Sequence, residues 1–245
     1  MSSDDRNRGL FGRALSRLIN VIPCVEQLRE TADDTYKEKE RQSAEKFLET
    51  LSAYLDKEKF ATVSLYLSQR QEDPGLKALV DESLKDVMSV DNELGKHCIA
   101  LAMVDRIHDP RAADGDYRQV VKLLQEANGR TLRVLLEMAD AVHVLDHRFI
   151  VLMAGEMPEG PVTYMISPGK APVFLSPSVT SSDFRRTIDL LVHHRMANRW
   201  GGAGSVHNKA PGILDLTLQH LGRIDDYHLD VWAYLRKYLE PVRRA

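Results

Sequence analysis

The sequence predicts a mainly α-helical protein: a multi-helical array over residues 1–147, followed by a small α+β region over residues 148–245. In the first part, apolar side chains recur at helical spacing, and Gly and Pro are scarce inside the helical runs. In the second part, short β-favouring runs alternate with Pro and Gly, which interrupt helices. The 245 residues are 43% hydrophobic, which is enough for a sizeable core in one large or two modest domains.

The N-terminal part begins with an amphipathic helix, residues 10–19, that should end near Pro23 because proline cannot donate within a helix. Residues 25–56 predict a long and densely charged helix. It is either an association arm that makes the protein a homo-oligomer or a solvated spacer helix. The apolar positions on which an association arm would pair are Leu28, Phe47, Leu48, Leu51 and Leu55.

Further helices follow within the array, and the residue before Pro110 marks one boundary because that position is pushed out of helical geometry. Asn128-Gly129 is a candidate for a left-handed cap that closes one of them. The helices are expected near residues 60–73, 76–90, 92–107, 117–128 and 132–139.

The α+β region begins with three short β-favouring runs, each bounded by Pro or Gly. A helix over residues 183–199 follows, capped by Ser181-Ser182-Asp183, and a glycine loop begins at Gly201. Residues 213–218 alternate like a strand. Thr217 is a candidate cap for a closing helix through Tyr227, and the aromatic residues up to Leu239 predict core packing. The three runs are residues 149–153, 162–166 and 173–175.

Charge is distributed unevenly along the chain. From Thr180 onward there are 10 Lys/Arg and 7 Asp/Glu, a net charge of +3, within a chain whose formal charge is −3. This asymmetry favours an anionic partner for the C-terminal part. The polar N-terminus, the lack of a long apolar run and the widely spaced Cys24 and Cys98 favour a soluble, cytoplasmic protein without disulfides.

Two histidine pairs are candidates for chemistry. His143 and His147 are four residues apart and would share a helix face, a spacing that suits a transition-metal ion, but no Glu lies between them as in metalloproteases. His193 and His194 are adjacent, diverge by about 100° on a helix, and are expected not to face one ligand together. We therefore expect no metal, no cofactor and no catalytic residues, with a metal-dependent enzyme as a remote alternative.

The order of helix, basic segment, glycine loop, strand and helix in residues 181–229 resembles the second half of a winged-helix domain. The resemblance implies recognition of nucleic acid or of a protein partner by a regulatory, non-enzymatic protein. The alternative is a helical scaffold in which this part only packs. The residues expected to contact the partner are cationic, because Arg binds phosphate through a planar fork. They are Arg186, His194, Arg195, Arg199 and Lys209.

A second resemblance rests on three segments of the helical array. Ala78-Leu79-Val80, residues 92–96 and Ile99-Ala100-Leu101-Ala102 look like helix pairs in bacterial proteins of the abortive-infection type. Those families are also helical arrays that end in a winged-helix-like part. The resemblance implies a bacterial protein with a role in phage defence.

Overall fold

The computed structural model of the chain divides into two compact units, Met1–Ala112 and Ala113–Ala245. In the first unit it describes residues 92–108 and short pieces between residues 46 and 90. In the second it describes residues 114–157, 160–199 and 219–245. The predicted strand 213–218, Trp200 and Lys209 lie outside the described residues, as do Cys24 and most of the predicted helix 25–56.

The first unit is described mainly by the helix α6, Glu93–His108. Its start is capped by Asn92, whose Oδ1 accepts a hydrogen bond from the amide of Leu94 at 2.9 Å. The predicted helix over residues 92–107 is therefore confirmed. Phe47 and Leu51 are each only 1% exposed within a single chain.

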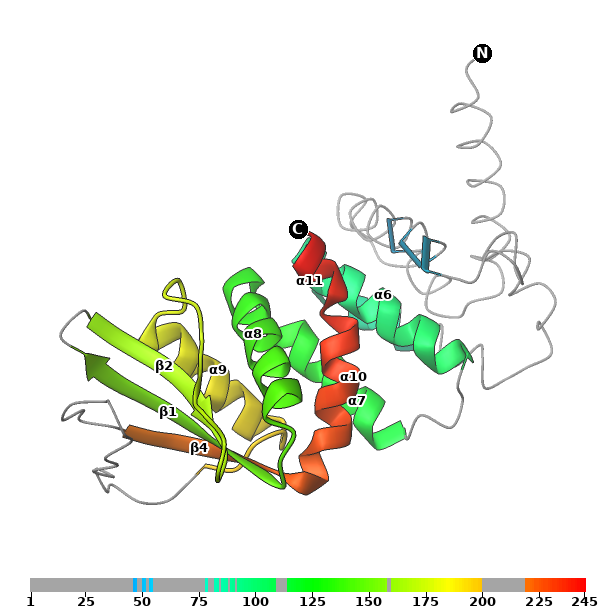
Figure 1. Cartoon of the computed structure of the whole chain (residues 1–245). Coiled ribbons are helices and arrows are strands. Elements are labelled where there is room, and N and C mark those ends of the chain that lie inside the picture. Colours follow the sequence, from blue (N-terminus) through cyan, green and yellow to red (C-terminus); the bar gives the residue numbers. More distant parts are fainter. Residues whose placement is uncertain are drawn as a thin grey trace, which may run out of the picture. The chain divides into compact units, whose positions relative to one another are not determined.

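The second unit contains a four-stranded antiparallel sheet in the order β3-β2-β1-β4. Figure 1 shows β2, β1 and β4 of this sheet next to one another. The three predicted β-favouring runs are confirmed as its first three strands. Leu152 of β1 pairs with Met165 of β2 on one side and with Gly222 of β4 on the other. The strands are β1 (Phe149–Met157), β2 (Gly160–Ile166), β3 (Val173–Phe174) and β4 (Gln219–Asp225).

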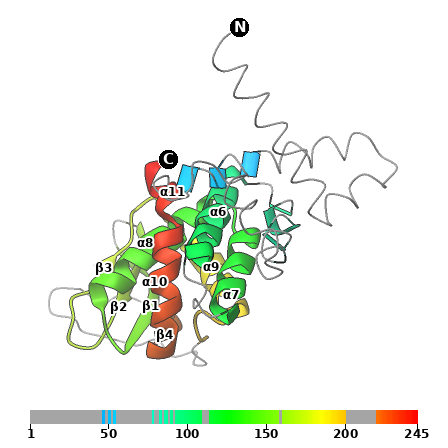
Figure 2. The same ribbon diagram turned by 90° about the vertical axis from the view of Figure 1, so that its right-hand side faces the viewer.

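Helices α8, Gly129–Leu145, and α9, Ser181–His193, pack against each other and against β2. The closing helix α10, Leu229–Tyr238, runs along α8 in both views (Figures 1 and 2). The remaining helical elements of this unit are α7 (Asp114–Glu126), the short η1 (Asp226–His228) and α11 (Glu240–Arg244). The core between helices and sheet is formed by fully buried side chains, among them Leu135, Met138, Ile150, Leu152, Met165, Phe184, Ile188, Ile224 and Trp232.

The prediction of a mainly helical protein with a small α+β part is confirmed at this level, and the described residues do not establish a winged-helix arrangement. The boundary between units differs from the expected one at residue 147. Helices α7 and α8 belong to the same unit as the sheet, because α8 packs on α9, α10 and β2. None of the helices that the structure describes has the length and apolar character needed to cross a bilayer.

Two of the predicted helix caps are wrong. Asn128 is not a left-handed cap; it is the N-cap of α8, with extended backbone and a side chain that accepts from the amide of Thr131. The cap of α9 is Thr180, whose Oγ1 accepts from the amide of Asp183 at 3.1 Å. In both cases a side-chain oxygen satisfies an amide of the first turn, which has no partner within the helix.

Helix α9 ends at His193 rather than near residue 199. The amide of Met196 donates to the carbonyl of Leu191 at 2.8 Å, and the amide of Arg195 donates to the carbonyl of Val192 at 3.1 Å. This pair of bonds is a Schellman motif, in which the residue after the C-cap adopts left-handed geometry. Arg195 occupies that position with φ of +56°. The backbone therefore reverses there, and the helix cannot continue.

The predicted closing helix through Tyr227 is also wrong, since residues 219–225 form β4 and α10 begins only at Leu229. Strand β4 completes the sheet by pairing with β1, and Ile224 lies opposite Ile150. A Cβ atom added at Gly222 would lie 3.1 Å from the carbonyl oxygen of Asn198. Close approach between the strand and the segment after α9 therefore favours glycine at this position.

Candidate functional site

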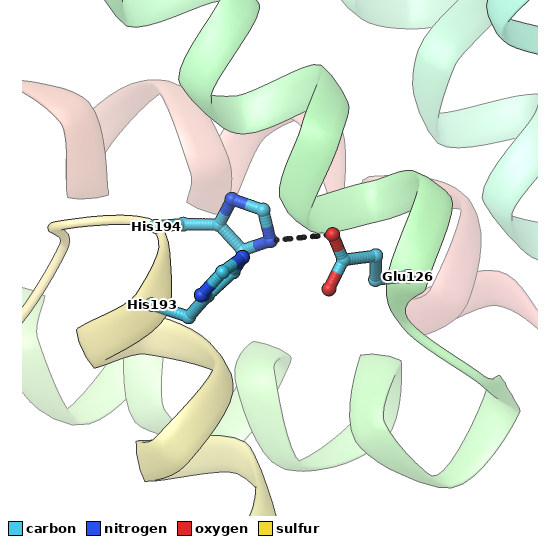
Figure 3. A group of neighbouring side chains, drawn as sticks. All are labelled: Glu126, His193 and His194. Atoms are coloured by element: carbon cyan, nitrogen blue, oxygen red, sulfur yellow. Dashed lines mark ion pairs between the residues drawn. The ribbon is translucent and has the colours of Figure 1, made fainter.

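Three side chains with metal-ligating atoms gather where α7 and α9 end: Glu126, His193 and His194 (Figure 3). One donor atom from each lies within 4.8 Å of the other two. Nε2 of His194 is 3.3 Å from Oε1 of Glu126. The two imidazole rings meet edge to face, with centroids 4.9 Å apart. In the described part of the chain, no other group of three or more such side chains is close enough to share an ion.

The three residues are placed by two helix ends. Glu126 is the last residue of α7, His193 is the last residue of α9, and His194 is the C-cap of α9. Nε2 of Gln119, two turns before Glu126, donates a hydrogen bond to the carbonyl of His194. This bond ties the C-terminal end of α9 to α7, and it satisfies one of the carbonyls that a helix end leaves without a partner.

His194 is the buried member of the group, at 8% exposure, whereas His193 and Glu126 are exposed. Its Nε2 atom is buried, and the carboxylate of Glu126 is the polar group that faces it. Burial lowers the pKa of His194 below its usual value, and the nearby charges of His193 and Lys122 act in the same direction, while Glu126 opposes them. The neutral imidazole, the form that ligates metals, is therefore favoured.

The expectation that His193 and His194 cannot face one ligand together is wrong. The 100° divergence between neighbours applies to Cα–Cβ directions, whereas an imidazole reaches several ångströms beyond Cβ through two rotatable bonds. In addition, His194 has left ideal helical geometry, with ψ of 12°. The donor atoms of both rings thus come within reach of Glu126.

The segment after α9 is bonded to the end of β4. Asn198 and Arg223 exchange backbone hydrogen bonds of 2.7 and 2.8 Å. The side-chain amide of Asn198 donates to Oδ2 of Asp225 at 2.6 Å, and Oδ1 of Asp225 lies 2.6 Å from Nε of Arg223. Strand β4 thereby fixes the path of the chain immediately after the two histidines.

Two buried side chains hold the same segment from the other side. The His228 ring accepts a hydrogen bond from the amide of Asp225 at its Nδ1 and donates one to the carbonyl of Arg195. The indole of Trp232 donates to the carbonyl of Met196 at 3.0 Å. These contacts hold Arg195 in its left-handed backbone geometry, which costs about 1–2 kcal/mol for a residue other than glycine.

The structure separates the residues that the sequence grouped as a partner-binding set. Arg186, Arg195 and Arg199 are exposed, and Arg199 forms an ion pair with Asp189. His194 is buried beside Glu126, and Lys209 lies outside the described residues. No ion pair engages Arg186 or Arg195 in the ranges that the structure describes.

Sequence reasoning missed Glu126, because nothing in its local pattern distinguishes it from the other charged residues on the surface of α7.

The pair His143 and His147 does not share a helix face. Helix α8 ends at Leu145, and its C-cap Asp146 has left-handed geometry, so His147 lies beyond the helix. His147 instead meets the ring of Phe149 edge to face.

Cys98 in the first unit is a free thiol, and burial raises its pKa to about 12, which makes it a poor nucleophile and ligand.

Comparison with known proteins gave no matching family model, no similar curated protein and no similar solved structure.

Proposed function

We propose that this protein is a non-enzymatic recognition protein that binds nucleic acid through phosphate contacts at the exposed side of α9 and the segment that follows it. The buried side of α9 carries Phe184, Ile188 and Leu191, which anchor the helix in the core. The opposite side carries Arg186 and leads to Arg195, both exposed. A firmly packed helix that presents arginines is suited to phosphate recognition, since it holds their positions with little loss of order on binding.

The observation that carries the proposal is the arginine at position 195. The left-handed position of a Schellman motif usually holds glycine, because any other side chain raises the backbone energy. Here an exposed arginine occupies it with φ of +56°, and buried partners on β4, η1 and α10 hold it in place. Strain of this kind concentrates at functional sites. The charge of Arg195 is therefore the property that we expect function to require.

The uneven charge of the chain supports the same proposal, because the residues from Thr180 onward carry a net charge of +3. The proposal includes the finer idea that the α9 region acts in the manner of a winged helix, with the glycine loop as a wing. A protein partner and a purely structural scaffold are the alternatives, and the binding experiment distinguishes them.

The test is a fluorescence titration of duplex and single-stranded DNA and RNA with the full chain at several salt concentrations. Binding through phosphates weakens as salt rises, because each neutralised phosphate releases counterions. The variant Arg186→Gln/Arg195→Gln should lower the slope of log K against log salt by about two, roughly one for each lost contact.

The matched control removes the same charge elsewhere. Arg133 on α8 and Arg148 between α8 and β1 are also exposed, so Arg133→Gln/Arg148→Gln changes the net charge equally without touching α9. Equal weakening by both double variants would mean that only net charge matters and would refute the proposed surface. No binding by the wild-type protein at low salt would favour a protein partner or the scaffold.

A further inference from the structure

We propose that Glu126, His193 and His194 bind a divalent transition-metal ion of the zinc class. The inference is independent of nucleic-acid binding and revises the expectation that the protein holds no metal. That expectation considered His143 and His147, whereas the structure brings a different set together from the ends of α7 and α9 (Figure 3). Two imidazoles and one carboxylate are a ligand set that zinc and related ions accept.

The geometry needs only small side-chain movements. Zinc bonds of about 2.0–2.2 Å place tetrahedral ligand atoms roughly 3.4 Å apart. The donor atoms of the three residues already lie within 4.8 Å of one another. His194 is held in place by burial, while His193 and Glu126 are exposed and can rotate toward it. One fixed and two adjustable ligands can therefore close around an ion without a change in the backbone.

The buried nitrogen of His194 is aimed at another member of the cluster. Nε2 is shielded from solvent and lies 3.3 Å from Oε1 of Glu126, with which it forms an ion pair when the ring is protonated. That distance is long for a hydrogen bond, whose usual length is about 2.9–3.0 Å, so the contact is weak. A metal ion between this nitrogen and the carboxylate of Glu126 would satisfy both groups.

The electrostatics of the helix ends favour a cation at this position. The C-terminal end of a helix carries a partial negative charge, and here the C-terminal ends of α7 and α9 both reach the cluster. Helix α7 has no basic residue in its last turn and ends instead in Glu126, whose charge the helix end itself disfavours. Lys122 on α7 is the opposing charge near His194. A divalent ion compensates the carboxylate and both helix ends.

Three protein ligands leave a tetrahedral ion with one open position, which water or an exchangeable anion fills. The site differs in this respect from a closed structural zinc site with four protein ligands. It also contains no thiolate, so the bound ion should show nitrogen and oxygen coordination only.

The test is isothermal titration calorimetry of the full chain with zinc, together with the visible absorption spectrum after cobalt(II) substitution. We expect one ion per chain, with micromolar or tighter affinity, and a cobalt spectrum without sulfur-to-metal charge transfer. His193→Gln and Glu126→Gln should each weaken zinc binding by at least about tenfold, since loss of a direct ligand costs no less than loss of its supporting contacts.

Both substitutions change exposed side chains, so circular dichroism should show unaltered folding, whereas the buried His194 is unsuitable as a first variant. His143→Gln is the matched control, because His143 is an exposed histidine on α8 outside the cluster. The zinc affinity of this variant should equal that of the wild-type protein. Absence of zinc binding by the wild-type protein would overturn the proposal and leave a buried histidine–glutamate contact. Wild-type affinity in the His193 and Glu126 variants would overturn it as well.

Discussion

Glycine at position 195 should give a more stable protein than alanine at the same position, while both replacements should weaken binding to nucleic acid. The left-handed backbone at this position, with φ of +56°, costs about 1–2 kcal/mol for any residue except glycine. Glycine gives back about 0.4–1 kcal/mol through the greater entropy of the unfolded chain. Glycine should therefore be more stable than alanine at this position by roughly 0.5–1 kcal/mol, which is about 1–4 °C in the melting temperature of a chain of this size.

The variant Arg195→Ala is the matched comparison, because alanine removes the same charge but keeps the backbone strain. A cation near a helix C-terminus also contributes about 0.3–1 kcal/mol, and both variants lose this contribution equally. The stability difference between Gly and Ala at position 195 therefore isolates the backbone. Urea unfolding monitored by circular dichroism measures it, and a fluorescence titration measures binding of both variants.

We expect the Gly variant to be more stable than the Ala variant, and both to bind nucleic acid about tenfold more weakly than the wild type at about 50 mM salt. Equal stability of the two variants would refute the assignment of strain to Arg195. Wild-type affinity in both would show that its charge serves no phosphate contact, and the argument that strain is retained for function would then fail.

Two further predictions concern the contacts that hold this region. Burial lowers the pKa of His228 below 6.5, so the unfolded state binds more protons at acidic pH, and stability should fall as pH decreases below about 6.5. Urea midpoints measured at several pH values should show a weaker dependence in His228→Gln, whose side-chain amide can replace both ring hydrogen bonds; an unchanged dependence would contradict this role. Gly222→Ala should destabilise the protein by about 1–3 kcal/mol, because the new methyl group would lie 3.1 Å from the carbonyl oxygen of Asn198. The control variant Gly129→Ala, at the first position of α8, should not destabilise the protein. Thermal unfolding that does not distinguish these two alanine variants would count against the close approach at Gly222.

The sequence alone predicted the elements whose signals are local. The runs at residues 149–153 and 162–166 became β1 and β2 because β-favouring side chains and the flanking Pro and Gly act over a few residues. The helix over residues 92–107 was identified for the same reason, since its apolar spacing and its end before Pro110 are both local. The exposed position of Arg186 also follows the periodic pattern of charge around the buried residues of α9.

Tertiary structure decided the features that depend on pairing between distant segments. Residues 219–225 have a helix-compatible composition, yet they form a strand because β1 offers an unpaired edge and Gly222 allows a close approach. Tertiary packing overrides weak local preference in such segments. The left-handed Arg195 was equally hidden, because its geometry depends on hydrogen bonds from η1 and α10 that no local pattern encodes.

The proposed metal site shows the same division. The histidines at positions 193 and 194 were visible in the sequence, but their position beside Glu126 depends on how α7 and α9 pack. A single glutamate at the end of a helix carries no signal of its own. Composition and periodicity thus determined elements such as α6, β1 and β2, because their signals depend on near neighbours. Only the packing of α7 against the end of α9 decided that these three side chains meet, because that contact depends on the whole core.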